Sequence, residues 1–383
     1  MRILVDGLPL LGKASISDFL RQLLLHLSAQ HGPYEYSILF RGLRTNTPNR
    51  ISNILQGVGL NRFKTKYLWM PNSLLEFCWT RCSIRFPMTE VFLGQPDIFF
   101  STVNRTPVAR GIPIVSLAYD LIALRFPDLY GHIDPLLPER LRKTVERSAA
   151  IIAISECTKR DYVEILGADP NLIHVVYPGV ESSFRAQLDE PARDTILRKY
   201  GLRQPYLLYV GTLAPHKNVE TLVRVYKRLK ERYNIPHYLV LCGQAQWGQK
   251  VVEAAKDLIA VRDCVVLDFI PSKDLPYVYH GAEAFVFLSL YEGFGLPPLE
   301  AMTCGIPVVA SSASSLPEVV GDAGILVDPT DEGAIETELY RVLTDESLRQ
   351  KMQAQGFQQA AHFSWSEAAE KILKVFNAVR CPR

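Results

Sequence analysis

The sequence lacks several features that would place it in other classes of protein. No apolar run of about 18 residues occurs, so no membrane-spanning helix is expected. The seven cysteines are an odd number without paired Cys-x-x-Cys spacing, which favours reduced thiols over a disulfide framework. Cys78 and Cys82 lie four residues apart, and buried apolar thiols are a simpler interpretation than a metal site. The strand-like run Met1–Asp6 has no secretory signal before it, so a cytoplasmic protein is expected.

Two further patterns are missing. A dinucleotide-dependent oxidoreductase would carry Gly-x-Gly-x-x-Gly between a strand and a helix, with an acidic residue about 20 positions on. No segment has this pattern, and Glu292-Gly-Phe-Gly295 lacks the third glycine. No internal repeat or low-complexity stretch occurs either. The sequence therefore argues against an NAD-dependent enzyme and against a repeat protein.

What is present fits a globular protein of more than one domain. The chain has 383 residues, more than one core usually holds, with 48% hydrophobic and 21% charged residues. Apolar runs alternate with helical patterns, as in parallel sheets with crossover helices. Buried strands are predicted at Ile3–Val5, Ile98–Phe100, Ile114–Leu117, Ile151–Ile154, Tyr206–Val210, Tyr238–Cys242, Val265–Leu267, Ala284–Leu288 and Val308–Ala310. We therefore predict an α/β fold with one domain over 1–185, a linker over 186–203 and a second domain over 204–363.

The net charge of +2 conceals an asymmetry. Residues 1–110 hold 13 Lys and Arg against 6 Asp and Glu, whereas the remainder holds 29 against 34. The basic part mixes cationic and aromatic side chains: Arg62, Lys64, Lys66, Arg81, Arg85, Trp69, Phe77 and Trp79. A solvated helix face is the simpler interpretation, and the alternative is peripheral contact with an anionic membrane at its inner face or with a lipid-linked pyrophosphate. No recognised nucleic-acid-binding module accompanies the charges, so no nucleic-acid partner is expected.

The most informative segment begins at Ser289. A buried strand, a glycine loop and a helix start are marked in turn by Ala284–Leu290, Gly293, Gly295, Pro297 and Pro298. Free backbone N–H groups at such a helix start bind anions, most often phosphate. Glu292 and Glu300 flank the seven residues of this loop. Because carboxylates would repel a phosphate, they are better interpreted as acceptors for sugar or ribose hydroxyls. The combination predicts a sugar-nucleotide site.

These motifs resemble the retaining glycosyltransferases of family 4. The resemblance is carried by Glu292–Glu300 and continues through Tyr209–Asn218, Ala153–Lys159 and Ser315–Gly324. It implies a GT-B fold, in which two Rossmann-like domains face each other across a cleft. The N-terminal domain would bind the acceptor and the C-terminal domain the donor. The amphipathic segment 364–383 would cross back to the first domain.

The resemblance also assigns residues of the second domain to the donor. A lysine matching Lys217, in the loop Gly211-Thr-Leu-Ala-Pro-His-Lys217, holds the donor diphosphate. Thr212 and His216 stand where an arginine might be expected, which would leave more of the leaving-group stabilisation to Lys217. Glu300 would hold the ribose and Glu292 would lie beside the donor sugar. The other expected donor contacts in this domain are Gly211, Phe269, Ile270, Phe294, Gly295 and Leu296. Phe269 and Ile270 follow a strand and would contact the base through the backbone, whereas Asp268 replaces a usual glycine, so base identity does not carry over.

In the first domain the resemblance is weaker. The loop that begins at Asp6 lacks the usual paired glycines, although Gly12 would still let the backbone approach the β-phosphate and Lys13 would reach the same charge. Tyr119 precedes Asp120 where many relatives have histidine followed by aspartate, and that histidine touches the donor sugar. A phenol hydrogen-bonds but stays neutral, so sugar binding by Tyr119 remains expected while an acid–base role does not. A purely structural Tyr119 is the alternative.

The predicted reaction is transfer of a hexose to a hydroxyl of a saccharide or lipid-linked acceptor, with retention. Likeness to bacterial mannosyltransferases of polysaccharide assembly favours GDP-mannose as the donor, and a UDP-hexose is the alternative. The catalytic residues would be Lys217, Glu292, Tyr119 and Asp120. Asp-x-Asp is absent from the sequence, so no metal and no cofactor beyond the nucleotide sugar is expected. A non-catalytic binding protein of the same fold also remains open, because Tyr119, Thr212 and the glycine-poor first loop all depart from the family.

Overall fold

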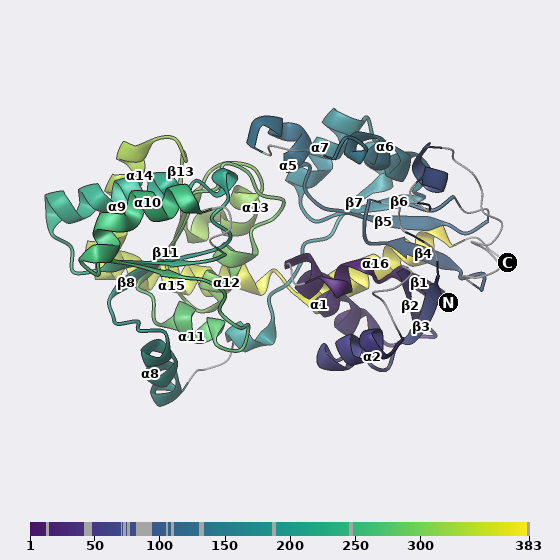
Figure 1. Cartoon of the computed structure of the whole chain (residues 1–383), viewed down its shortest axis with the longest axis horizontal. Coiled ribbons are helices and arrows are strands. Elements are labelled where there is room, and N and C mark those ends of the chain that lie inside the picture. Colours follow the sequence, from purple (N-terminus) through teal and green to yellow (C-terminus); the bar gives the residue numbers. More distant parts are fainter. Residues whose placement is uncertain are drawn as a thin grey trace. The chain divides into compact units, whose positions relative to one another are not determined.

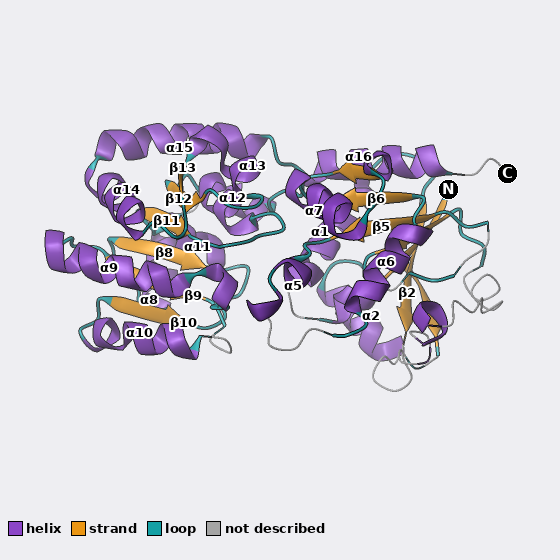
Figure 2. Cartoon of the chain, turned by 90° about the horizontal axis from the view of Figure 1, so that it is seen from above, coloured by secondary structure: helices purple, strands orange, loops and turns teal. Residues whose placement is uncertain are grey.

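The structure is a computed structural model that divides into two compact units. Unit 1 comprises Met1–Gly179 and Ser364–Arg383, and unit 2 comprises Val180–Phe363. The described residues are 1–12, 15–41, 48–69, 71, 74, 77–81, 94–104, 106–108, 111–129, 134–185, 189–244 and 248–380. Each unit contains one parallel sheet with helices on both faces (Figures 1 and 2).

The sheet of unit 1 has the order β3-β2-β1-β4-β5-β6-β7, and all neighbouring strands in it are parallel. Its strands are β1 Arg2–Asp6, β2 Glu35–Arg41, β3 Lys64–Leu68, β4 Ile98–Ser101, β5 Ile114–Ala118, β6 Ala150–Ala153 and β7 Ile173–Val175. The strands β4, β5 and β6 are buried along their whole length, as continuous apolar runs in parallel sheets usually are.

Helices and short turns connect these strands. They are η1 Leu8–Leu11, α1 Ser15–Ala29, α2 Pro48–Gly57, η2 Phe77–Arg81, α5 Ile122–Arg125, η3 Pro127–Leu129, α6 Leu137–Arg147, α7 Glu156–Leu166 and η4 Pro170–Leu172. The last helix of the chain, α16 Trp365–Val379, also belongs to unit 1. Trp365 packs edge-on against Phe19 of α1 with ring centroids 5.0 Å apart, and Phe376 packs against Phe100 of β4 at 5.3 Å. The amphipathic C-terminal segment therefore completes the core of the first unit.

The sheet of unit 2 has the order β10-β9-β8-β11-β12-β13 and is likewise parallel throughout. Its strands are β8 Tyr206–Val210, β9 Tyr238–Cys242, β10 Cys264–Leu267, β11 Ala284–Phe287, β12 Val308–Ser311 and β13 Ile325–Val327. The helices and turns are η5 Ser182–Arg185, α8 Glu190–Lys199, η6 Pro215–Lys217, α9 Val219–Tyr233, α10 Gln249–Ala260, α11 Leu275–His280, α12 Leu296–Thr303, α13 Leu316–Val320, η8 Gly321–Ala323, α14 Glu332–Thr344 and α15 Glu346–Ala361.

A ladder of ion pairs joins α9 to α14 on one face of this sheet. Arg224 and Arg228 contact Glu332 at 2.7 and 2.5 Å, and Arg228 and Arg232 contact Glu336, both at 2.9 Å. The arginines recur every four residues and therefore lie on one side of α9. The ladder holds α9 in place directly after the loop that carries Lys217.

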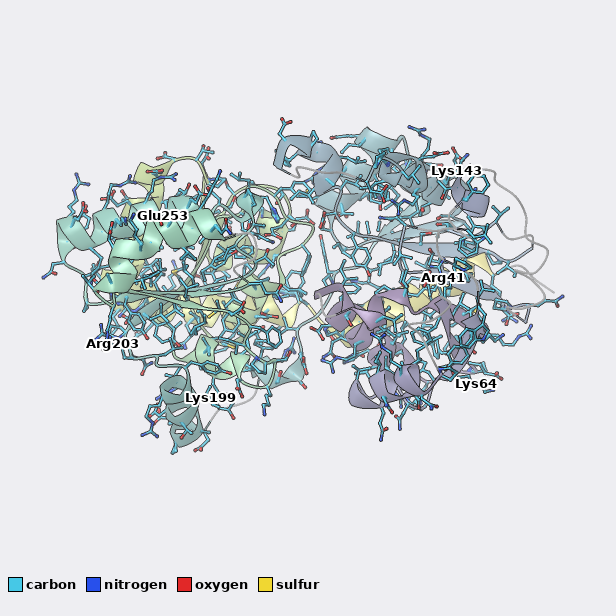
Figure 3. All side chains as sticks on the ribbon, viewed as in Figure 1. Arg41, Lys64, Lys143, Lys199, Arg203 and Glu253 are labelled. Atoms are coloured by element: carbon cyan, nitrogen blue, oxygen red, sulfur yellow. The ribbon has the colours of Figure 1, made fainter. Side chains whose placement is uncertain are left out.

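The predicted linker over 186–203 differs from the structure. Part of it is helix α8, capped by the Asp189 carboxylate, which accepts from the N–H of Ala192. Lys199, labelled in Figure 3, and Tyr200 both contact the Asp274 carboxylate, at 2.5 and 2.7 Å. A polar, charged sequence was interpreted as a connection, but its charges fix it to unit 2.

No helix within the described ranges combines the length and the apolar character that crossing a bilayer requires.

Candidate functional site

The strand order of unit 2 reverses between β8 and β11. These strands are neighbours, but the connection leaving β8 leads to β9 on one side, and the chain leaving β11 leads to β12 on the other. Ligands of open α/β sheets bind outside the carboxyl ends of the strands at such a point. The loop after β8 carries Lys217 and the loop after β11 carries Glu292, so two predicted site residues belong to this switch point.

Close backbone packing shapes the loop after β8. Gly211 has φ +153°, and its N–H donates to the Cys242 carbonyl at 2.8 Å. A Cβ on Gly243, after β9, would lie 1.7 Å from the Gly211 carbonyl oxygen, so only glycine fits there. The N–H of Leu290 donates to the His216 carbonyl at 2.8 Å and ties the two switch-point loops together. Gly243 was not singled out from the sequence, since a lone glycine after a strand is a weak signal.

Lys217 and Glu292 form an ion pair at this edge. Lys217 Nζ lies 2.6 Å from Glu292 Oε1, and the two side chains are 15% and 12% exposed. Lys217 Nζ also lies 5.5 Å from the ring centre of Phe287, the last residue of β11. The lysine is therefore held over the switch point by a carboxylate and an aromatic face. The ammonium group is therefore fixed in position before any ligand is considered.

His216 precedes this lysine and stays uncharged. Burial and, to a smaller degree, the Lys217 charge lower its pKa to about 4, and the Glu292 charge opposes this change only in part. At neutral pH the imidazole therefore adds hydrogen-bonding capacity without positive charge. Asn218 stands at the start of α9, but its side chain does not cap that helix. Its amide donates to the Pro329 carbonyl at 2.8 Å instead.

The glycine loop opens α12 as predicted. Gly295 is the residue before the helix, with φ +121°, and a Cβ there would lie 2.8 Å from Leu316 Cδ2. Because Pro297 and Pro298 have no N–H, Leu296 is the one residue among the first three of α12 whose backbone N–H can be offered to an anion. Phe294 is buried against Phe363 with centroids 5.7 Å apart, so any ligand contact it makes is through its backbone. Leu296 is half-buried at the helix start.

Two serines that the sequence analysis did not assign hold this loop in shape. The Ser314 hydroxyl accepts from the Glu292 N–H at 2.9 Å, and the Ser315 hydroxyl donates to the Phe294 carbonyl at 2.6 Å. Ser315 is fully buried, while Ser314 has a φ of +57°. The run Ser315–Gly324 was noted for its resemblance alone, and its role in supporting the glutamate loop needed coordinates.

Glu300 lies on α12, with one carboxylate oxygen oriented by a tyrosine. The hydroxyl of Tyr279, on α11, donates to Glu300 Oε2 at 2.9 Å. Burial raises the pKa of Tyr279 well above its ordinary value, and the Glu300 charge raises it further, so the phenol remains the donor. Glu300 itself is half-buried, which suits a carboxylate that accepts from ligand hydroxyls.

Solvent exposure changes from residue to residue along the loop after β10. Ile270 is 7% exposed and belongs to the core, whereas the adjacent Phe269 is 66% exposed. Asp268 is also exposed. The two predicted base-contacting residues therefore offer different surfaces, and only Phe269 presents its side chain to solvent.

Gly12, Tyr119 and Asp120 belong to unit 1. The Tyr119 hydroxyl is buried and makes no hydrogen bond with the residues that the structure describes, although the rest of the residue is half-buried. Burial raises its pKa, and the nearby Tyr162 and Asp6 raise it further. The ring packs edge-on against Phe19, with centroids 5.8 Å apart.

Asp120 is exposed and accepts from the Ile122 N–H at 3.2 Å, which starts α5. Gly12 is exposed with an extended backbone, φ −87°, so its conformation does not require glycine. Lys13 lies outside the described residues. Asp6, at the end of β1, is fully buried and ion-paired with Arg41, which Figure 3 labels. The predicted first loop thus begins on a buried ion pair.

The basic and aromatic residues of the first unit differ in their exposure to solvent. Trp69 and Phe77 are each 52% exposed, whereas Trp79 is 3% exposed beneath the Arg41 guanidinium. Trp79 therefore belongs to the core and not to a surface. Lys64 is exposed on β3 (Figure 3). Arg85, Cys82 and the side chains of Arg81 and Cys78 lie outside the description.

Comparison with known proteins gives matches over most of the chain. Residues 19–184 match the family described as Glycosyltransferase Family 4, and residues 192–359 match Glycosyl transferases group 1. O-antigen chain mannosyltransferase B of Escherichia coli is 34% identical over 63% of this chain and 64% of its own. The serotype-specific mannosyltransferase WbdA of Escherichia coli is 32% identical over 75% of this chain and 36% of its own. The chain thus spans less than two thirds of either relative.

Solved structures agree on the fold. Anabaena Alr3699/HepE, in complex with UDP and glucose, superposes with a TM-score of 0.75 at 16% identity, covering 99% of this chain and 100% of the other. WaaG, a glycosyltransferase involved in lipopolysaccharide biosynthesis, gives 0.70 at 14% identity, covering 98% and 99%.

Proposed function

The chain belongs to the glycosyltransferases that combine a Family 4 domain with a group 1 domain and has their GT-B fold, and from this premise we propose which reaction it catalyses. A hexose passes from a nucleotide-sugar donor to a hydroxyl of a saccharide or lipid-linked acceptor, with retention at the anomeric carbon. GDP-mannose is the first candidate donor, because the relatives at 34% and 32% identity are named mannosyltransferases. A UDP-hexose is the alternative.

The position of Lys217 and Glu292 on either side of the switch point of unit 2 is the observation that carries this proposal. The donor diphosphate lies against the first turn of α12 and takes Lys217 Nζ as its charged partner. Glu292, released from the lysine, accepts from a hydroxyl of the donor sugar. Glu300, oriented by Tyr279, accepts from the ribose. Each contact uses a group that the fold already holds in place.

The bond changes follow from this arrangement. The bond between the anomeric carbon and the phosphate oxygen breaks while the acceptor oxygen bonds to the same carbon from the same face. The acceptor proton passes to the departing phosphate. Negative charge grows on the diphosphate during this step, so Lys217 and the backbone N–H of Leu296 at the start of α12 stabilise the transition state more than the ground state. His216 is neutral and leaves that charge to Lys217.

A donor screen followed by product analysis tests the proposal. Binding of GDP-, UDP-, ADP- and TDP-hexoses is compared by thermal shift, where a donor at 100 times its Kd adds about 2.7 kcal/mol of stability. The donor that binds is then incubated with saccharide acceptors, and the anomeric configuration of the product is determined by NMR. An inverted product rejects retention. Donor binding without transfer to any acceptor identifies a non-catalytic protein of this fold.

We also propose that a lipid-linked acceptor is met at the inner face of the membrane through the first unit. Trp69 and Phe77 expose half of their surface, and Lys64 is 80% exposed near them in sequence. Aromatic and basic side chains together suit an anionic interface. Co-sedimentation with vesicles containing about a third anionic lipid, compared with neutral vesicles, measures this contact. Equal sedimentation with both would leave the solvated-face interpretation.

A further inference from the structure

We propose that Asp268 reads the base of the donor nucleotide and selects guanine, with Phe269 as the surface on which the base stacks. The inference rests on the proposed function, because it needs a nucleoside diphosphate at the carboxyl edge of the second sheet. It adds a specificity-determining residue that the family motif does not contain.

The place of Asp268 in the sheet suits this role. It directly follows β10, which is separated from β8 by β9 alone. Strands lie about 4.8 Å apart, so the end of β10 is about 10 Å from the strand whose loop carries Lys217. The N–H of Gly243 donates to the Leu267 carbonyl at 2.9 Å and fixes the end of β10 against the segment after β9. A nucleotide with its diphosphate at Lys217 extends along this edge toward Asp268.

The segment between β10 and β11 links the base end to the ribose end. Asp268 stands at its start, and α11 near its end carries Tyr279, which orients Glu300. The residue expected to hold the ribose and the residue proposed to read the base are thus positioned by one connection. The carboxylate of Asp268 makes no hydrogen bond or ion pair with the described residues. It is exposed and available to a ligand.

The chemistry of the bases decides which one fits. The pairing edge of guanine presents two adjacent donors, N1–H and the N2 amino group, and a carboxylate can accept from both at once. Uracil presents one N3–H between two carbonyl oxygens, and those oxygens repel a carboxylate. Adenine and cytosine place an acceptor nitrogen beside their single amino group. Only guanine matches both oxygens of Asp268.

Phe269 supplies the second part of the site. Its side chain is 66% exposed directly beside Asp268, while Ile270 anchors the same loop in the core. An aromatic ring stacks on any base, so Phe269 contributes affinity without selection. The two neighbours therefore have separable effects: Phe269 on binding of all nucleotides and Asp268 on the choice among them.

Calorimetric titration of the full chain with GDP, IDP, UDP and ADP tests the proposal. IDP differs from GDP by the missing N2 amino group, so the GDP-to-IDP ratio isolates one charge-assisted hydrogen bond. We expect wild type to bind GDP about tenfold or more tightly than IDP, and more tightly still than UDP or ADP. Asp268→Asn keeps the shape but loses the charge and an acceptor, and the GDP-to-IDP ratio should fall to within about threefold.

Asp257→Asn is the matched control, since Asp257 is 76% exposed on α10 in the same unit. It should keep the wild-type ratio. Phe269→Ala should weaken GDP and UDP by a similar factor, about 5- to 100-fold. Equal affinity of wild type for GDP and IDP, or a ratio that survives Asp268→Asn, overturns the inference while leaving the nucleotide site in place. Absence of binding by all four nucleotides would instead reject the proposed function itself.

Discussion

Lys217 Nζ and Glu292 Oε1 lie 2.6 Å apart, although the two residues are 75 positions apart in the chain. The pair is mostly buried, and a lysine and a glutamate so placed neutralise each other before any ligand arrives. On the function proposed above, a donor diphosphate would replace this carboxylate as the partner of Lys217. The exchange leaves Glu292 free to accept from a sugar hydroxyl only when the diphosphate is bound. Binding of the two parts of the donor would then be coupled through one ion pair.

Lys217→Ala should abolish most transfer and weaken binding of the nucleoside diphosphate. A charge-assisted contact contributes about 1.5–3 kcal/mol to binding, and more where charge develops in the transition state. The fall in kcat/KM should thus exceed the fall in nucleotide affinity, which is measured by titration calorimetry. Lys256→Ala, on the exposed face of α10, is the control. Wild-type turnover in Lys217→Ala would remove this residue from the site.

The two glutamates should differ in their effect on free nucleotide. Glu292→Gln releases Lys217 from its carboxylate partner, so affinity for the free diphosphate should hold or rise while turnover with intact donor falls. Glu300→Gln removes a charged acceptor for the ribose, so nucleotide affinity should fall about 10-fold or more. Both constants are measured for each variant with the same donor. An equal loss of free-nucleotide affinity in the two variants contradicts these roles.

His216 should make stability depend on pH in the weakly acidic range. Its pKa is about 4 in the folded protein and near 6.5 when unfolded, so the unfolded chain binds more protons between these values. The contribution is complete above about pH 6.5, is lost as the pH falls toward 4, and is constant below that. Urea unfolding of wild type and His216→Gln at several pH values isolates the effect by difference. Parallel curves from pH 4 to 7 would show that His216 titrates normally.

Tyr119→Phe should affect rate and stability differently. The hydroxyl is buried without a partner among the described residues, so its removal should leave the melting temperature unchanged or slightly higher. If the hydroxyl bonds to the donor sugar, turnover with intact donor falls about 5- to 150-fold. Binding of the free diphosphate stays unchanged, and Tyr119→His recovers part of the rate. A phenylalanine variant that matches wild type in both rate and stability assigns Tyr119 to packing.

Transfer should persist without a divalent metal. The sequence has no Asp-x-Asp, and Lys217 with the positive end of the α12 dipole can neutralise the diphosphate. Initial rates are measured after dialysis against EDTA, with Mg²⁺ or Mn²⁺ added back in parallel. Rates within about twofold of each other are expected. Activity lost in EDTA and restored by metal would show that the lysine does not suffice.

The buried strands could be predicted from sequence because their apolar runs are continuous. β8, β9 and β12 match the predicted ranges closely, since both faces of each strand are covered. The edge strand β3 was missed, because Lys64-Thr-Lys-Tyr-Leu68 is polar and only half-buried. β7 and β13, at sheet edges, have three residues each, too few for a periodic signal. The inner strand β2 was missed as well, whereas the edge strand β10 was predicted, so the position of a strand in its sheet does not by itself decide whether local pattern identifies it.

The candidate site, like the sheets, could be predicted from the sequence only in part. The glycine loop and the proline start of α12 follow from local backbone chemistry and were predicted. The ion pair of Lys217 with Glu292 and the hydrogen bond of Tyr279 to Glu300 join distant segments, and no local pattern specifies them. For Trp79, local sequence suggested a surface position, and the structure contradicts it. Its position among basic residues suggested a surface, but the Arg41 beneath which it lies is itself buried with Asp6.

The strand order of the second sheet also constrains how that unit reaches its native state. β8 pairs with β11, which the ribosome adds only after the whole of β9, α10 and β10. Closure of such distant segments is slow because loop entropy is lost before the contact is gained. A nascent chain that ends before β11 contains the loop after β8, with Lys217, but not the loop after β11. Lys217 therefore has no Glu292 with which to pair. If the protein binds nucleotide as proposed, nascent chains that end before β11 would lack this affinity. The affinity would be gained only once β11 has joined the sheet.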